Sequence, residues 1–279
     1  MSTSSRPFLH LLIIDPQNDF CDLPPARCAP GHSPALPVSG ADADMQRLGA
    51  LIAAAQARID AITLTLDSHH RLDIAHPAFW QDRDGGQVLP FTQITAAALR
   101  AGQFRPRLPE HGPRAQAYLD ALEATGRYTL MVWPVHCEIG TWGHAVHDSV
   151  HAAYQAWEEQ RQRSVHKLLK GSNPWTEHYS ALQAEVPDAK DPASQLNREL
   201  LNQLAQADEI WVAGEASSHC VRATVEHLLQ HLPQPLLPRI SLLTDCMSPV
   251  AGFEAQQAEF FAAMRSRGLQ LLSSSEAMR

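Results

Sequence analysis

The sequence lacks any apolar run near the roughly 18 residues that a bilayer-spanning helix requires. It also lacks an excess of basic residues, because 22 lysines and arginines stand against 30 aspartates and glutamates. A formal net charge of −8 gives no electrostatic footprint for nucleic acid or an anionic membrane. We therefore expect neither a nucleic-acid nor a membrane partner, but a pocket that binds a small molecule.

Cysteine is scarce and scattered. The five cysteines are an odd number and form no Cys-x-x-Cys pair, which favours reduced thiols over a disulfide framework. Residues 1–7 lack the basic-then-apolar layout of a secretory signal. These features predict a cytoplasmic location.

Apolar segments alternate with amphipathic ones along most of the chain. This alternation predicts an α/β fold with a parallel, doubly wound sheet. We expect a single domain over residues 1–279, since α/β units of this size commonly form one. The expected strands are 8–14, 61–66, 128–133, 165–169, 210–213, 239–243 and 269–272, and the clearest helices are 45–59, 115–125, 143–163, 195–207 and 253–265.

Residues 77–127 interrupt the alternation. They are rich in proline and glycine, and only 115–125 has a strong helical pattern. So long a stretch predicts an insertion, either a lid or an oligomer contact.

Cys220 lies where a strand is expected to turn into a helix. The apolar run before it stops at Gly214, and helical spacing begins after it. Unpaired N–H groups at a helix start favour thiolate over thiol and can hold an oxyanion. The alternative is that Cys220 is a small buried apolar residue, as most free cysteines are.

Asp15 and Lys170 also follow expected strands, 8–14 and 165–169. In open parallel sheets, ligands bind beyond the carboxyl ends of the strands. A carboxylate there can take a thiol proton and return it to a leaving amine, and an ammonium stabilises both anions. Asp15, Lys170 and Cys220 therefore form a candidate set of base, cation and nucleophile, although Asp15 could instead be a turn residue.

A second group of side chains has the chemistry of metal ligands. Asp67 ends the strand 61–66, several histidines follow it up to His76, and His136 follows the strand 128–133. Carboxylate and imidazole suit a borderline divalent metal, and two strand ends could meet over one ion. The alternative is that these histidines are solvated loop residues.

The sequence resembles the isochorismatase-like cysteine hydrolases and, within them, is most similar to nicotinamidases. Five segments carry the resemblance in the family's order: 14–21, 67–69, 133–137, 170–171 followed by 179–180, and 214–221. The resemblance implies a mostly parallel six-stranded sheet flanked by helices. It also implies a cis peptide between Glu215 and Ala216. The lid-like insertion at about 77–127 exceeds the short form of the family.

The resemblance further implies a role for each matched residue. The catalytic triad would be Asp15, Lys170 and Cys220, and the oxyanion hole the amides of Ala216 and Cys220. The substrate ring would lie against Phe20, Trp133 and Tyr179. One divalent ion, zinc or else iron or manganese, would be held by Asp67, His69 and His136, with His76 as a less certain fourth ligand and His70 competing with His69.

The implied activity is hydrolysis of a small carboxamide, nicotinamide to nicotinate and ammonia or a related amide, through a thioester. A homo-oligomer is expected. The alternatives are a metal-free amidase of the same fold acting on a carbamoyl or ureido substrate, a catalytically silent binding protein, and a zinc hydrolase that uses metal-bound water. Three arginines of the insertion could meet a substrate carboxylate or remain solvated: Arg100, Arg105 and Arg107.

Overall fold

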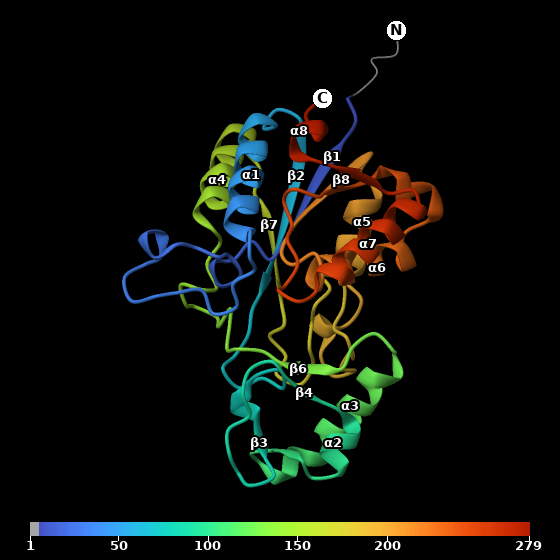
Figure 1. The fold of residues 1–279 in the computed structure, drawn as a ribbon. Helices are drawn as coiled ribbons and strands as arrows, with labels where there is room; N and C mark the ends of the chain where they lie inside the picture. Colours follow the sequence, from blue (N-terminus) through green and yellow to red (C-terminus); the bar gives the residue numbers. More distant parts are fainter. Residues whose placement is uncertain (1–5) are drawn as a thin grey trace.

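The computed structural model describes residues 6–279, which are organised around a six-stranded sheet (Figure 1). The strand order is β10-β9-β8-β1-β2-β7, and every neighbouring pair is parallel. The predicted doubly wound parallel sheet is confirmed. The strands are β1 (Leu9–Ile14), β2 (Ile59–Asp67), β7 (His166–Lys170), β8 (Glu209–Gly214), β9 (Ile240–Leu243) and β10 (Gln270–Leu272).

Helices cover both faces of this sheet (Figure 1). Because successive side chains of a strand point to opposite faces, β1 supplies both cores. Leu11 and Ile13 belong to the cluster that contains α1 and α4, while Leu12 and Ile14 belong to the cluster that contains α5, α6 and α7. The helices are α1 (Ala41–Ala54), α4 (Asp148–Arg161), α5 (Arg198–Ala205), α6 (Cys220–His231), α7 (Glu254–Ser266) and the short α8 (Ser274–Ala277).

The strand order changes direction at β1, which lies between β8 and β2. A crevice opens at such a switch point, beyond the carboxyl ends of the strands. The chain leaves β8, β1, β2 and β7 at this same edge, and Figure 1 shows the insertion beyond it. The topology therefore places four strand ends side by side, next to the insertion.

The segment beyond these strand ends, called the cover below, is the chain between β2 and α4, which includes residues 77–127. The sequence predicted its helix at 115–125 and its strand at 128–133 but not its other short strands, because three-residue strands carry no measurable periodicity. Whether the segment acts as a lid or an oligomer contact stays a prediction. Its elements are β3 (Trp80–Asp82), β4 (Thr92–Ile94), α2 (Ala96–Arg100), β5 (Phe104–Pro106), α3 (Gly112–Ala124) and β6 (Leu130–Val132).

The segment 128–133 is a strand, as predicted, but not a strand of the parallel sheet. It forms β6, which pairs antiparallel with β4 in a separate two-stranded ladder. His136 therefore reaches the sheet edge from the loop after β6 rather than from the end of a neighbouring parallel strand. The apolar character of a short segment does not specify which partner it pairs with, so the sequence could not distinguish these arrangements.

The five cysteines are all free, in agreement with the prediction of reduced thiols. Four are buried, and Cys28 is partly exposed. Within residues 6–279, no helix has the length and apolar character needed to span a membrane.

Candidate active site

Four adjacent strands each place one chemical group at the carboxyl edge. Asp15 follows β1, and Cys220 opens α6 after β8. Asp67 and Lys170 are the last residues of β2 and β7 and face each other in register. Groups that are far apart in the sequence are thus neighbours because their strands are neighbours.

Lys170 lies at the centre of this group. Its Nζ is 2.8 Å from Asp15 Oδ2, 3.2 Å from Asp67 Oδ1 and 3.6 Å from Cys220 Sγ, and it donates to the carbonyl of His178. All of these side chains are buried. The structure therefore brings together the three residues predicted as base, cation and nucleophile, and adds Asp67 to them.

Burial favours the neutral form of both Asp15 and Lys170, but the neighbouring charges change the outcome for Lys170. Burial raises the pKa of Asp15, and Lys170 only partly opposes this. Burial also disfavours the Lys170 ammonium, but Asp15 and Asp67 outweigh it and raise the pKa of Lys170 well above its usual value. Thr65 Oγ1 donates to Asp15 Oδ1 at 2.5 Å, which fixes the carboxylate. Asp15 is therefore held as a base whose proton affinity exceeds that of a solvated aspartate.

The thiol of Cys220 is equally affected by burial, which raises its pKa well above the ordinary value despite the opposing effect of Lys170. The thiolate stabilisation predicted from the helix start is therefore outweighed. Such a thiol needs a base to become a nucleophile. Two carboxylates lie beside the same ammonium, and of these Asp67 also contacts His69 and His136, which leaves Asp15 as the candidate base.

The turn between β8 and α6 shapes the backbone around Cys220. Gly214 has φ of +114°, and a Cβ there would lie 2.0 Å from the carbonyl oxygen of Ile14, so only glycine fits. The Glu215–Ala216 peptide is cis, as the resemblance implied. The backbone N–H groups of Ala216 and Cys220 find no acceptor among residues 6–279. Both amides are thus free to donate to a ligand.

The predicted metal ligands also converge. Asp67 Oδ2 is 3.1 Å from His69 Nε2 and 3.4 Å from His136 Nε2. The nearest ligand atoms of His69, His76 and His136 all lie within 4.8 Å of one another, and all three residues are buried. His70 is exposed, so the structure places His69 and not His70 in the cluster.

This donor set fits a divalent ion. His69 Nε2 is buried and has no hydrogen-bond partner within the described chain, although Asp67 lies close to it. Burial, with the neighbouring His136 and His69, lowers the pKa of His76 to about 3, which keeps the imidazole in its neutral, ligating form. One carboxylate with three imidazoles suits zinc, iron or manganese.

Asp73 belongs to the same cluster but escaped the sequence interpretation. His69 Nδ1–H donates to Asp73 Oδ2 at 3.2 Å, while Asp73 Oδ1 accepts from the amide of Ala75. A carboxylate behind a ligating histidine fixes its tautomer and its orientation. The available signal was the acidic residue four positions after His69, inside the histidine-rich segment.

Asp73→Ala is expected to weaken the affinity for a divalent ion by roughly 10- to 100-fold, because His69 loses the group that orients it. Competition of the purified protein against a zinc chelator measures this affinity. Asp73→Asn, which keeps a hydrogen-bond acceptor but no charge, should have an affinity between those of Asp73→Ala and the wild type. His70→Ala is the matched control and should bind as the wild type does; equal affinity for Asp73→Ala would show that Asp73 has no part in the site.

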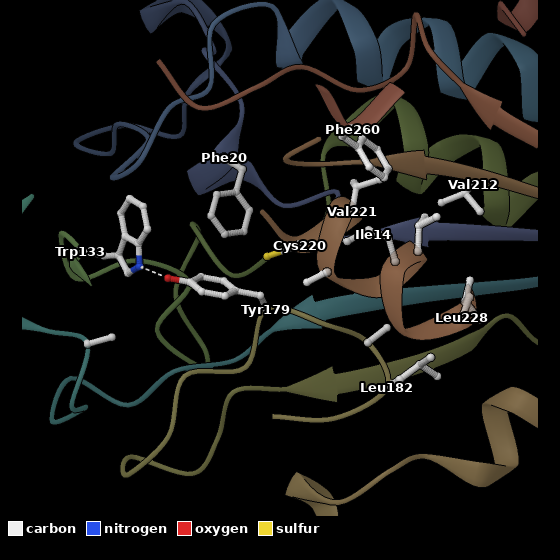
Figure 2. Packing of buried hydrophobic residues seen from close by; sticks show 14 of the residues in the cluster. Ile14, Phe20, Trp133, Tyr179, Leu182, Val212, Cys220, Val221, Leu228 and Phe260 are labelled. Atoms are coloured by element: carbon white, nitrogen blue, oxygen red, sulfur yellow. Dashed lines mark hydrogen bonds between the residues drawn. The ribbon is translucent and has the colours of Figure 1, made fainter. Parts of the chain in front are cut away.

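The thiol opens into a cavity of about 30 Å³. The predicted ring-binding residues line it: Phe20, Trp133 and Tyr179 surround Cys220 in Figure 2, and Trp133 Nε1 donates to Tyr179 Oη at 3.1 Å. A volume of this size holds about one water molecule. Side chains of the lining must therefore move before a ring can enter.

Two further residues of the lining were not singled out in the sequence. Glu177 is buried, its Oε2 has no partner within residues 6–279, and burial raises its pKa to about 7. His219 packs edge-on against Trp133 and Tyr179. Glu177 lies two positions before Tyr179 and His219 directly precedes Cys220, and this proximity in the sequence was the available signal.

Known proteins resemble this chain in their structures, whereas the sequence comparisons find no match. No protein-family model matches the chain, and no curated protein sequence matches it significantly.

Solved structures share the fold over nearly the whole chain. A nicotinamidase/pyrazinamidase from Acinetobacter baumanii matches with a TM-score of 0.62 at 17% identity, covering 99% of this chain and 100% of that one. The yeast nicotinamidase bound to the inhibitor nicotinaldehyde matches with 0.60 at 17% identity, covering 95% and 100%. The pyrazinamidase of Pyrococcus horikoshii in complex with zinc matches with 0.53 at 18% identity, covering 96% and 99%. The isochorismatase-like fold expected from the sequence is confirmed.

Proposed function

We propose that this protein is a metal-containing cysteine amidase that hydrolyses a small ring carboxamide, nicotinamide or a close relative, to the acid and ammonia. The observation that carries the proposal is the position of Lys170, whose Nζ contacts Asp15 and Cys220 and also the candidate metal ligand Asp67. The candidate nucleophile, its candidate base and a candidate metal ligand thus meet at one buried ammonium. The fold is the one found in nicotinamidases, and this supports the choice of substrate.

In the first half of the reaction, the Asp15 carboxylate takes the proton of the Cys220 thiol, and Sγ attacks the carboxamide carbon. The N–H groups of Ala216 and Cys220 donate to the oxygen as it becomes negative. The C–N bond then breaks, Asp15 returns its proton to the nitrogen, and ammonia leaves. The acyl group remains on Cys220 as a thioester.

In the second half, Asp15 takes a proton from water, whose oxygen attacks the thioester carbon, and the C–S bond breaks. The proton returns to sulfur, and the carboxylic acid is released. Lys170 stays protonated throughout and stabilises the negative charge that passes between Asp15 and Cys220. Asp67, His69, His76 and His136 would hold a divalent ion, which would supply a Lewis acid to orient a ring nitrogen.

A metal-free amidase of the same fold is less well supported. It would leave three buried imidazoles clustered without an ion, with a protonated His69 paired to Asp67 instead, since, despite burial, Asp67 raises the pKa of His69 well above its usual value. A silent binding protein would not require Asp15, Lys170 and Cys220 to be retained together.

Release of ammonia from a panel of nicotinamide, pyrazinamide, a carbamoyl amino acid and a ureido acid tests the substrate class. We expect the two ring amides to exceed the aliphatic compounds in kcat/KM by roughly 100-fold, since only a flat ring fills an aromatic-lined cavity. Turnover of the aliphatic compounds at the same rate would remove the nicotinamidase-like assignment. No ammonia from any amide would remove the amidase assignment as well.

A further inference from the structure

A second and larger cavity lies beside the catalytic one. It is an open cleft of about 360 Å³ between the connection from α3 to β6, helix α6 and the start of α7. No step of the proposed reaction uses it. Its lining is Gly126, Arg127, Tyr128, Ser218, His219, Arg222, Glu226, Phe253 and Gln256.

One side chain belongs to both cavities. His219 lines the catalytic cavity and the cleft, and its ring lies 5.6 Å from Tyr179 on the first side and 4.6 Å from Phe253 on the second. Ser218 and His219 Nδ1 share a hydrogen bond of 2.9 Å. Rotation of this one ring would join the closed cavity to the open cleft along a continuous aromatic wall.

Two arginines line the cleft, Arg127 and Arg222. Arg222 Nε donates to Glu226 Oε1 and Arg127 Nη2 donates to Glu226 Oε2, both at 2.8 Å, so one carboxylate serves two guanidinium groups. Behind Arg127, Glu185 lies 3.7 Å away, buried and outside the cleft lining. Glu185 therefore serves Arg127 from behind, and on the cleft side the Arg222 guanidinium shares its only carboxylate, Glu226, with Arg127.

Donors in the cleft remain available. Among residues 6–279, the two terminal nitrogens of Arg222 have no hydrogen-bond partner. A guanidinium with both terminal nitrogens free matches the two oxygens of a carboxylate. The insertion arginines considered from the sequence are not in the cleft; Arg100, for example, pairs with Asp120 on the surface.

We propose that the cleft is a subsite for a carboxylate carried by the amide substrate, so that the preferred substrate is an acidic amide rather than a neutral one. The proposal rests on the amidase function. The scissile amide lies at Cys220, the His219 ring turns aside, and the distal carboxylate of the same molecule pairs with Arg222. Nicotinamide itself would then be a truncated substrate that fills only the catalytic cavity.

The test uses nicotinamides that bear a carboxyalkyl chain of increasing length on the ring, each compared with its own methyl ester. We expect at least one acid to exceed its ester in kcat/KM by roughly 10-fold or more, the range for a charge-assisted pair. Arg222→Gln should abolish this preference and leave turnover of nicotinamide unchanged. Arg222→Lys, which keeps the charge without the fork, should retain part of it, and the exposed Arg265→Gln should behave as the wild type.

A binding measurement separates this proposal from the amidase assignment. In a Cys220→Ala background, calorimetry should show the acid binding more tightly than its ester by a similar factor, and Arg222→Gln should remove the difference. If the protein hydrolyses nicotinamide but no acid exceeds its ester in rate or affinity, the subsite is wrong. If no amide is hydrolysed but acids bind through Arg222, the subsite stands and the amidase function is wrong.

Discussion

Replacing Cys220 with alanine should lower the rate of amide hydrolysis by on the order of 10⁴-fold or more, because the variant has no atom that can form the thioester. The loss should appear in kcat, since the aromatic lining and the metal ligands remain. A single sulfur is removed from a buried position, so the variant should still fold. Ammonia release under saturating substrate, with thermal unfolding as a check on folding, measures both effects.

Cys246→Ala is the matched control, because Cys246 is also buried but lies outside the catalytic cavity. It should keep its activity. Retained turnover in Cys220→Ala would exclude the thiol as nucleophile and favour attack by metal-bound water. Alkylation is a weaker test of the nucleophile, because Cys220 is buried with a raised pKa while Cys28 is partly exposed.

His136→Ala should lose both the ion and the activity. The purified wild-type protein is expected to contain about one divalent ion per chain, and removing one imidazole from a buried set leaves few substitutes. Elemental analysis measures the content, and a titration with added zinc, iron or manganese measures the residual affinity. Excess metal should restore part of the turnover in proportion to the ion bound.

His70→Ala serves as the control here as well, because His70 is a nearby histidine that is exposed. It should keep both ion and activity. Fully active wild-type protein without a bound ion would contradict the metal assignment and favour the metal-free carbamoyl or ureido amidase. A Cys220→Ala protein that retains its ion would show that the two groups of side chains are independent.

The sequence was most informative where a buried strand ends in a polar residue. β1 and β2 are mostly apolar and almost wholly buried because both of their faces are covered, and this pattern made their ends visible. Once the sheet was inferred to be parallel, Asp15, Asp67 and Lys170 had to share one edge. The position of Cys220 followed from the change from apolar strand to helical spacing after Gly214.

Other features depended on tertiary contacts that no local pattern encodes. The partner of β6 is β4, 36 to 40 positions before it in register, and only the folded insertion brings them together. Asp73 is one acidic residue among many until its contact with His69 is seen. The cleft beside His219 is assembled from three separated segments, of which only the one around Cys220 was singled out in the sequence.

The two histidines that flank the insertion have a consequence for its topology. His76 immediately precedes residues 77–127 and His136 lies shortly after them, and their ring nitrogens are 3.4 Å apart across 60 positions of sequence. An ion shared by this pair and by Asp67 at the end of β2 would close that long segment into a loop fastened to the sheet. Closing a loop of this length removes much of the freedom of the unfolded chain. The ion would then be a cross-link as well as a cofactor, tying the cover to the sheet as a disulfide would in a protein with no disulfide of its own.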